Sequence, residues 1–133
     1  IFTNCILKVL IARPRPYADE NSIFYQFWLL VGQNVESDKS FPSGHTTAAF
    51  ATMTAVFMVG DKRVSWTAYI FAILMGIARI YLVVHFPSDV LAGIIVGIIA
   101  GVLGTILSRK LPEKFYDKNI FQKKGGGAHC SAG

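Results

Sequence analysis

Apolar residues fall into long blocks along the chain, and short polar segments separate them. The first block, residues 1–12, predicts a helix that ends before Pro14 and Pro16, because proline donates no backbone hydrogen bond and disfavours helix in the residue before it. A second block at residues 23–31 is rich in aromatic side chains and too short to cross a bilayer, so it suits the headgroup region. Polar loops are expected at residues 17–22 and 32–40.

The second half of the chain carries the longer blocks. Ser43 is a plausible N-cap for a helix over residues 44–59. A polar turn is expected at residues 60–63, followed by a helix over residues 64–84 that is long enough to cross a membrane, since a span needs about 20 residues. Residues 90–107 contain no charged side chain and predict another crossing helix. The pattern therefore predicts an all-α protein, a transmembrane helical bundle.

Small residues mark where these helices should meet. Gly93, Gly97 and Gly101 recur every four residues and give one helix a smooth face. Residues 44–59 are rich in alanine and threonine. Such faces let helices approach closely in lipid, so we expect these two helices to pack together.

Composition agrees with a membrane protein. Of the 133 residues, 53% are hydrophobic and only 16% are charged, which is more apolar than a soluble domain of this size requires. Because residue 1 already lies inside an apolar block, we expect upstream helices before it. We divide the chain into a membrane domain, residues 1–107, and a basic, flexible cytoplasmic tail, residues 108–133. Cys5 and Cys130 are far apart and have no metal-ligand spacing, so neither a disulfide nor a zinc site is expected.

The charges predict an orientation. The turn at residues 60–63 and the tail together hold eight Lys and Arg against three acidic residues. The opposite side holds five basic and five acidic residues. Since Lys and Arg concentrate on the cytoplasmic side, the other side should face outward from the plasma membrane. This topology explains the net charge of +5 better than nucleic-acid binding does.

Three polar residues interrupt the apolar second half: Arg79, His85 and Asp89. Charged groups at the end of a membrane helix are costly and usually functional. Asp89 can orient the ring of His85 and leave one ring nitrogen free, and Arg79 can bind an anion. Taken singly, each has an ordinary explanation as an interfacial histidine, a helix-start carboxylate or a snorkelling arginine.

Two other segments offer related chemistry. The turn before residue 45 opens a helix, so Ser43 and the backbone of Gly44 can cradle an anion, and His45 can protonate a leaving oxygen. Lys8 and Arg15 add two cations. They would share a helix face if the helix continued, but Pro14 favours an extended segment at Arg15. Alone, this pair would be an ordinary basic flank.

Combined, these groups suit phosphoryl transfer. Cations and N–H groups would stabilise the phosphoryl oxygens, His85 would attack, and His45 would protonate the departing alcohol. Asp89 is the one carboxylate within the motifs, so neither a metal site nor a cofactor is expected.

The motifs resemble those of the type 2 phosphatidic acid phosphatase family, membrane lipid phosphatases that share a fold with vanadium haloperoxidases. The three signatures occur in order: Lys8 with Arg15-Pro16, Pro42 to His45, and Arg79 with His85 and Asp89. The family's third motif usually begins Ser-Arg, and Ala78 stands at the Ser position. The resemblance implies a six-helix fold, of which this chain would supply the C-terminal part. It also implies His85 as nucleophile, Asp89 as its orienting partner, His45 as acid, and a phosphate site made of Lys8, Arg15, Ser43, Gly44 and Arg79.

We therefore expect a metal-independent membrane phosphatase that acts on a phosphorylated membrane lipid, such as phosphatidic acid or phosphatidylglycerophosphate, through a phosphohistidine. One alternative is an undecaprenyl or other polyprenyl diphosphate phosphatase. Two others belong to different classes, a vanadate-dependent haloperoxidase and a membrane protein that binds anions or lipids without turnover.

Overall fold

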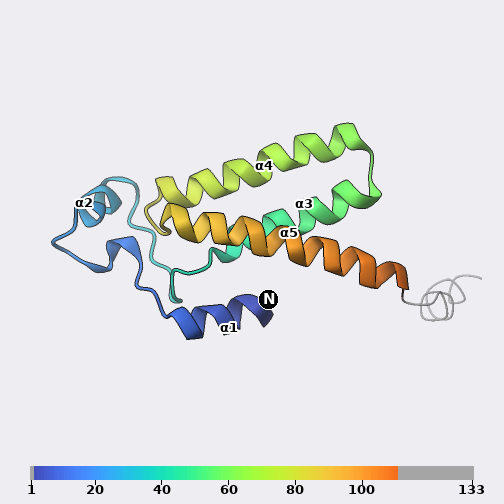
Figure 1. Cartoon of the computed structure of the whole chain (residues 1–133). Coiled ribbons are helices and arrows are strands. Elements are labelled where there is room, and N and C mark those ends of the chain that lie inside the picture. Colours follow the sequence, from blue (N-terminus) through green and yellow to red (C-terminus); the bar gives the residue numbers. More distant parts are fainter. Residues whose placement is uncertain (1, 111–133) are drawn as a thin grey trace, which may run out of the picture.

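The computed structural model describes residues 2–110, and every regular element among them is helical. The elements are, in order, α1 (Phe2–Ile11), the short 3-10 helix η1 (Pro16–Ala18), α2 (Ile23–Leu30), α3 (Gly44–Val59), α4 (Lys62–Tyr81) and α5 (Pro87–Lys110). Figure 1 shows α3, α4 and α5 as long, roughly parallel rods, with α2 at the end where α4 stops and α5 starts. The all-α prediction is confirmed.

The closest packing joins α3 and α5 through the predicted glycine face. A Cβ added to Gly93 would lie 2.9 Å from the carbonyl oxygen of Ser43, and one on Gly97 would lie 2.7 Å from that of Thr47. A Cβ on Gly101 would lie 2.6 Å from the carbonyl oxygen of Ala51. Only glycine permits this approach, which holds the two backbones at close range over two turns of helix.

Helix α4 differs from its predicted bounds at both ends. It begins at Lys62 because the Asp61 side chain accepts hydrogen bonds from the backbone N–H groups of Arg63 and Val64 and so caps the helix. It ends at Tyr81, and Val83 then takes a positive φ of 55°. The prediction that residues 60–63 form the turn and 64–84 the helix was therefore wrong by two or three residues at each end.

Helix α5 is also longer than expected. It starts at Pro87, which suits the first turn because its missing N–H needs no partner there. It continues to Lys110, so the first three residues of the predicted tail are helical. The remainder of that tail, residues 111–133, lies outside the described residues, as does Cys130.

The N-terminal half follows the predicted order. Helix α1 ends at Ile11, and Arg15 has extended backbone angles, φ −80° and ψ 158°, as its position between two prolines favoured. In α2, the buried Trp28 stacks on Tyr17 with ring centroids 4.8 Å apart and donates a hydrogen bond to the carbonyl oxygen of Asn34. This tryptophan fastens α2 to the segments on either side of it.

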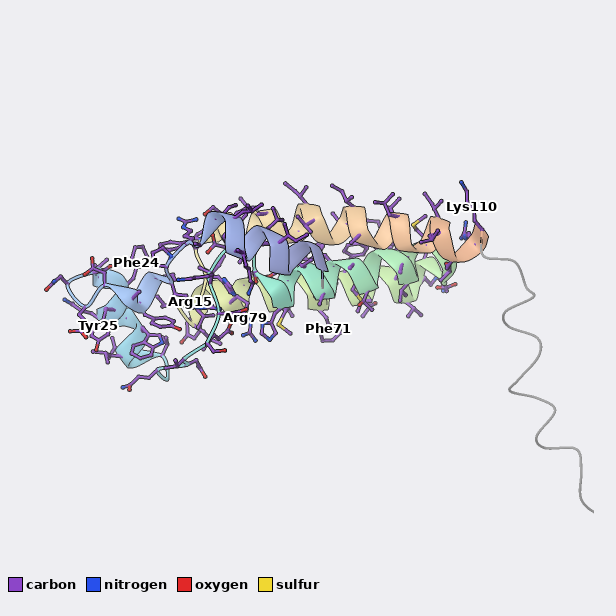
Figure 2. The ribbon with its side chains drawn as sticks, turned by 90° about the horizontal axis from the view of Figure 1, so that it is seen from below. Arg15, Phe24, Tyr25, Phe71, Arg79 and Lys110 are labelled. Carbon is purple, nitrogen blue, oxygen red and sulfur yellow. The ribbon has the colours of Figure 1, made fainter. Side chains whose placement is uncertain are left out.

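By length and composition, α4 and α5 could each cross a membrane. Large apolar side chains such as Phe71, Ile77, Ile95 and Leu103 are exposed on their outer faces. Figure 2 shows Arg15 and Arg79 near α2 at one end of the molecule and Lys110 at the opposite end. The predicted separation of the motif end from the basic end is thus present.

Candidate active site

Backbone hydrogen bonds bring the motif-bearing segments together at one end of the helices. The N–H of Ser43, which precedes α3, donates to the carbonyl oxygen of Asp89 in the first turn of α5 at 3.0 Å. The N–H of Ser40 donates to the carbonyl oxygen of Arg13 at 3.0 Å. Segments 46 and 27 residues apart along the chain are therefore held side by side.

The Glu36 carboxylate lies at the centre of the cluster. Its Oε2 atom is 2.8 Å from Arg15 Nη2 and 4.0 Å from His85 Nε2. Its Oε1 atom is 3.1 Å from Arg79 Nη1 and 4.0 Å from His45 Nδ1. Two cations and two imidazoles drawn from all three motifs thus face one carboxylate.

A second carboxylate, Asp38, connects the remaining predicted cation, Lys8, to the cluster. It forms ion pairs with Lys8 and Arg15. Burial alone would raise the pKa of Asp38, but the hydrogen bonds and charges of Lys8 and Arg15 outweigh it and lower that pKa below its ordinary value. Lys8 therefore belongs to the same cluster through Asp38 rather than through Glu36.

Arg15 is the most enclosed of the cations, with 6% of its surface exposed. Its Nη1 donates to the carbonyl oxygen of Val84 at 2.8 Å, and its Nε donates to the carbonyl oxygen of Asp38 at 2.9 Å. These bonds fix the guanidinium plane, so Arg15 presents Nη2 to the Glu36 carboxylate in a single orientation.

The guanidinium of Arg79 has fewer hydrogen bonds than that of Arg15. Arg79 occupies the last turn of α4, where a cation is favoured by the helix dipole. Its Nη1 contacts Glu36, whereas its buried Nε has no hydrogen-bond partner among the described residues. An unpaired buried donor is costly, so Arg79 has hydrogen-bonding capacity for a further acceptor at this position.

His85 is almost fully buried, with 2% of its surface exposed. Its Nδ1 is 3.9 Å from Asp89 Oδ2, which is longer than a hydrogen bond. The hydroxyl of Ser40 lies between them: it donates to Asp89 Oδ2 and is 3.4 Å from His85 Nδ1. Desolvation by burial, with a smaller effect from the Arg15 charge, lowers the pKa of His85 from 6.5 to about 4, so the ring is neutral at neutral pH.

Asp89 is fully buried and its charge is compensated. Arg13 Nη1 lies 2.8 Å from Oδ1 and also donates to the hydroxyl of Ser88 at 2.7 Å. The backbone N–H of Phe86 donates to Oδ2 at 3.1 Å. The Arg13 guanidinium stacks over the Phe86 ring at 4.1 Å, which keeps the arginine in place.

The start of α3 lies where the sequence predicts it. Ser43 is the N-cap residue and is fully buried, but its hydroxyl shares a 2.9 Å hydrogen bond with the hydroxyl of Thr46 instead of capping a backbone N–H. Gly44 and the half-exposed His45 line a cavity of about 270 Å³ together with Lys8, Glu36 and Asp38. This polar cavity gives the cluster an opening to the outside.

An apolar cavity of about 360 Å³ adjoins the other side of His85. Aromatic and aliphatic side chains from α2, the end of α4 and the following turn form it, among them Phe24, Phe27, Ile80 and Phe86. The histidine therefore lies between a charged compartment and an apolar one.

All eight predicted site residues lie at this end of the molecule. Sequence analysis missed four others that contact them: Arg13, Glu36, Asp38 and Ser40. Arg13 and Ser40 each lie within two residues of a motif, so their position was the one available signal. Glu36 and Asp38 belong to a loop whose path the sequence pattern does not define. Within residues 2–110, no group of three or more His, Cys, Asp or Glu side chains is arranged to hold a metal ion.

Comparison with known proteins connects this geometry to a family. The model of the PAP2 superfamily matches residues 1–113. No solved structure matches the chain significantly.

Three curated relatives illustrate the similarity. Undecaprenyl-diphosphatase BcrC of Bacillus subtilis is 33% identical, over 69% of this chain and 44% of its own length. Phosphatidylglycerophosphatase B of the same organism is 39% identical, over 68% of this chain and 43% of its own. Lipid A 1-phosphatase of Rhizobium johnstonii is 34% identical, over 67% of this chain and 35% of its own. The chain thus spans less than half the length of each of these relatives.

Proposed function

The chain belongs to the PAP2 superfamily, and on that premise we propose that it carries the catalytic centre of a metal-independent lipid phosphatase that works through a phosphohistidine. The apolar helices and the membrane-lipid phosphatases among its relatives make it an integral membrane protein. The observation that carries the proposal is the position of Glu36, whose two oxygens pair with Arg15 and Arg79 and lie 4.0 Å from His45 and His85.

A carboxylate and a phosphoryl group offer similar acceptors to these side chains. Both present two or more neighbouring oxygen atoms, and arginine binds either through paired N–H groups. In the proposed complex the phosphoryl oxygens replace those of Glu36 and receive hydrogen bonds from Arg15 and Arg79. The unpartnered Nε of Arg79 supplies one further donor.

The chemistry then follows from the two histidines. His85 Nε2 attacks phosphorus while the bond from phosphorus to the lipid oxygen breaks, and protonated His45 gives its proton to that oxygen. Water next attacks the phosphohistidine, His45 accepts a proton from that water, and phosphate leaves with His85 restored. The low pKa of His85 supports its role, because the ring must be neutral to attack.

The substrate class is supported by the apolar cavity beside His85. Its volume of about 360 Å³ and its aromatic lining suit the first carbons of an acyl or prenyl chain. We propose a lipid monophosphate or diphosphate as substrate; the relatives described above include one named for each kind, an undecaprenyl-diphosphatase and a phosphatidylglycerophosphatase.

The excess of Lys and Arg that the sequence predicts on the side of the 60–63 turn and the tail supports an outward-facing site in the plasma membrane. Membrane-impermeant thiol reagents test this orientation in intact cells after Cys5 and Cys130 are replaced by serine. Glu20→Cys, near the site, should be labelled, and Arg63→Cys at the other end should not. The reverse pattern would place the site in the cytoplasm.

The mechanism is tested by phosphate release from a lipid panel with the full-length protein in detergent. Wild-type protein should release phosphate in the presence of EDTA, and acid-quench experiments with labelled substrate should trap label on His85. His85→Ala should abolish both signals. Activity that is lost in EDTA and restored by Mg²⁺, or that survives in His85→Ala, would exclude this mechanism.

A further inference from the structure

Asp89 and His85 do not touch, although the carboxylate and the ring face each other. Their nearest atoms, Oδ2 and Nδ1, are 3.9 Å apart, whereas an N–H to oxygen hydrogen bond measures about 2.7–3.2 Å. The Ser40 hydroxyl is closer to both, within hydrogen-bond distance of Oδ2 and 3.4 Å from Nδ1. Any hydrogen-bonded connection between Asp89 and the ring therefore passes through Ser40.

The direction of the hydrogen bonds follows from what each group can do. The Asp89 carboxylate forms an ion pair with Arg13, and a carboxylate in such a pair can only accept hydrogen bonds. The hydroxyl has one proton, which it donates to Asp89, and its lone pairs remain available to accept. Nδ1 must then carry the ring proton and donate to Ser40. The neutral ring keeps its lone pair on Nε2, the atom that faces Arg15 and Glu36.

Ser40 is rigidly held for this task. It is completely buried, and its backbone N–H is bonded to the carbonyl oxygen of Arg13. Asp89 is held in turn by Arg13 and by the N–H of Phe86. The groups that face the ring are thus Ser40 on one side, and Arg15 and Glu36 on the other. On the Nδ1 side, the hydroxyl lies closer to the ring than the Asp89 carboxylate does, and the backbone of Ser40 also interacts with the ring.

We propose that Ser40 is the positioning residue that couples Asp89 to His85 and fixes the proton of the ring on Nδ1. This inference rests on the proposed role of His85 as nucleophile. Without the hydroxyl, Nδ1 loses its side-chain partner and keeps only the backbone of Ser40, so a larger fraction of the neutral ring carries its proton on Nε2. In that tautomer Nε2 has no lone pair for attack on phosphorus.

The test compares Ser40→Ala with Ser37→Ala, an exposed serine of the same loop. We expect Ser40→Ala to lower kcat about tenfold to a hundredfold, the range seen when a partner that orients a histidine is removed. KM should stay within about twofold, because Ser40 contacts none of the cations of the anion site. Ser37→Ala should match the wild type in both constants.

A second readout does not depend on turnover. In protein labelled with ¹⁵N-histidine, the ring nitrogen shifts report which atom carries the proton. Wild-type His85 should be protonated on Nδ1, and Ser40→Ala should show a substantial fraction protonated on Nε2. Ser40→Cys, which keeps a weak donor of similar size, should be intermediate in both readouts and covers the case in which the alanine variant does not fold.

The outcomes separate this proposal from the proposed function. Unchanged kcat and an unchanged tautomer in folded Ser40→Ala or Ser40→Cys would overturn the role of Ser40 while leaving His85 as nucleophile. A rise in KM as large as the fall in kcat, with the tautomer unchanged, would also overturn it, since these changes would indicate a merely structural serine. Full activity of His85→Ala would instead refute the proposed function.

Discussion

The carboxylate of Glu36 lies 2.8 Å from the guanidinium of Arg15, at the position where we propose the substrate phosphoryl group binds. Substrate must therefore displace a resident counter-ion. In Glu36→Gln this competing charge is gone, so orthovanadate and inorganic phosphate should inhibit the enzyme about threefold to tenfold more strongly. Inhibition curves with the lipid substrate measure the change.

Glu20→Gln is the matched control, because Glu20 is exposed and lies outside the cluster. It should leave inhibition by vanadate unchanged. Weaker inhibition in Glu36→Gln would mean that Glu36 organises the arginines for phosphate and does not compete with it.

The apolar cavity predicts a difference between lipid and soluble substrates. Phe27 lines this cavity, so Phe27→Ser should raise KM for a lipid phosphate about tenfold, which corresponds to about 1.4 kcal/mol of lost apolar contact. Hydrolysis of a soluble aryl phosphate, which has no long chain, should change less than twofold. Leu29→Ser alters the same helix outside the cavity lining and should affect neither substrate. Equal effects on both substrates would contradict a chain-binding role.

The buried ring of His85 predicts an unusual pH dependence. Burial, followed by the Arg15 charge, lowers its pKa from 6.5 to about 4, so the ring should stay neutral down to that pH. NMR titration of labelled histidine, with the signal assigned from His85→Gln, measures it directly. Arg15→Gln should move the pKa upward. Titration of the folded wild type near 6.5 would show that the ring is solvated.

The same shift has a consequence for stability. Between pH 6.5 and 4 the unfolded chain takes up a proton at this histidine and the folded chain does not, so folding stability should fall as pH drops through that window. The thermal midpoint of His85→Gln should depend less on pH than that of the wild type over this range.

The glycine face of α5 predicts that the cost of adding a methyl group depends strongly on which glycine is replaced. Gly97→Ala would place a methyl group 2.7 Å from the carbonyl oxygen of Thr47 and 2.8 Å from Cβ of Phe50, so the helices must separate. We expect a loss of about 1–3 kcal/mol, the usual cost of overpacking, and a lower thermal midpoint in detergent. A Cβ on Gly104, in the same helix, would meet nothing within 4 Å, so Gly104→Ala should be tolerated. Equal effects would contradict the packing described.

The sequence predicted the helices and their contact because both depend on local or periodic signals. The four-residue glycine spacing identified the face of α5 that meets α3, and the two prolines correctly predicted an extended Arg15. Helix ends were less accurate. Asp61 caps α4, so the helix begins two residues before the predicted apolar block, and the predicted turn was longer than the real one.

The surroundings of the motifs could not be predicted in the same way. Glu36 and Asp38 belong to a loop without periodicity, and their contacts with Arg15 depend on the three-dimensional path of that loop. The direct pairing of Asp89 with His85 was expected from their spacing of four residues across a helix start. In the structure, Asp89 Oδ2 and His85 Nδ1 are 3.9 Å apart. The intervening hydroxyl comes from a different part of the chain, which no local pattern reveals.

The contact of Gly93 with the carbonyl oxygen of Ser43 has a consequence for substrate range. Because the two backbones approach closely here and the N–H of Ser43 is bonded to the carbonyl oxygen of Asp89, the start of α3, which bears His45, is held against the start of α5. Accommodation of bulkier or slimmer headgroups must then come from the other walls, α2 and the stretch bearing Glu36, which are attached mainly through side chains. The side of the site formed by α3 and α5 is therefore rigid, and the side formed by α2 and the stretch bearing Glu36 can adapt.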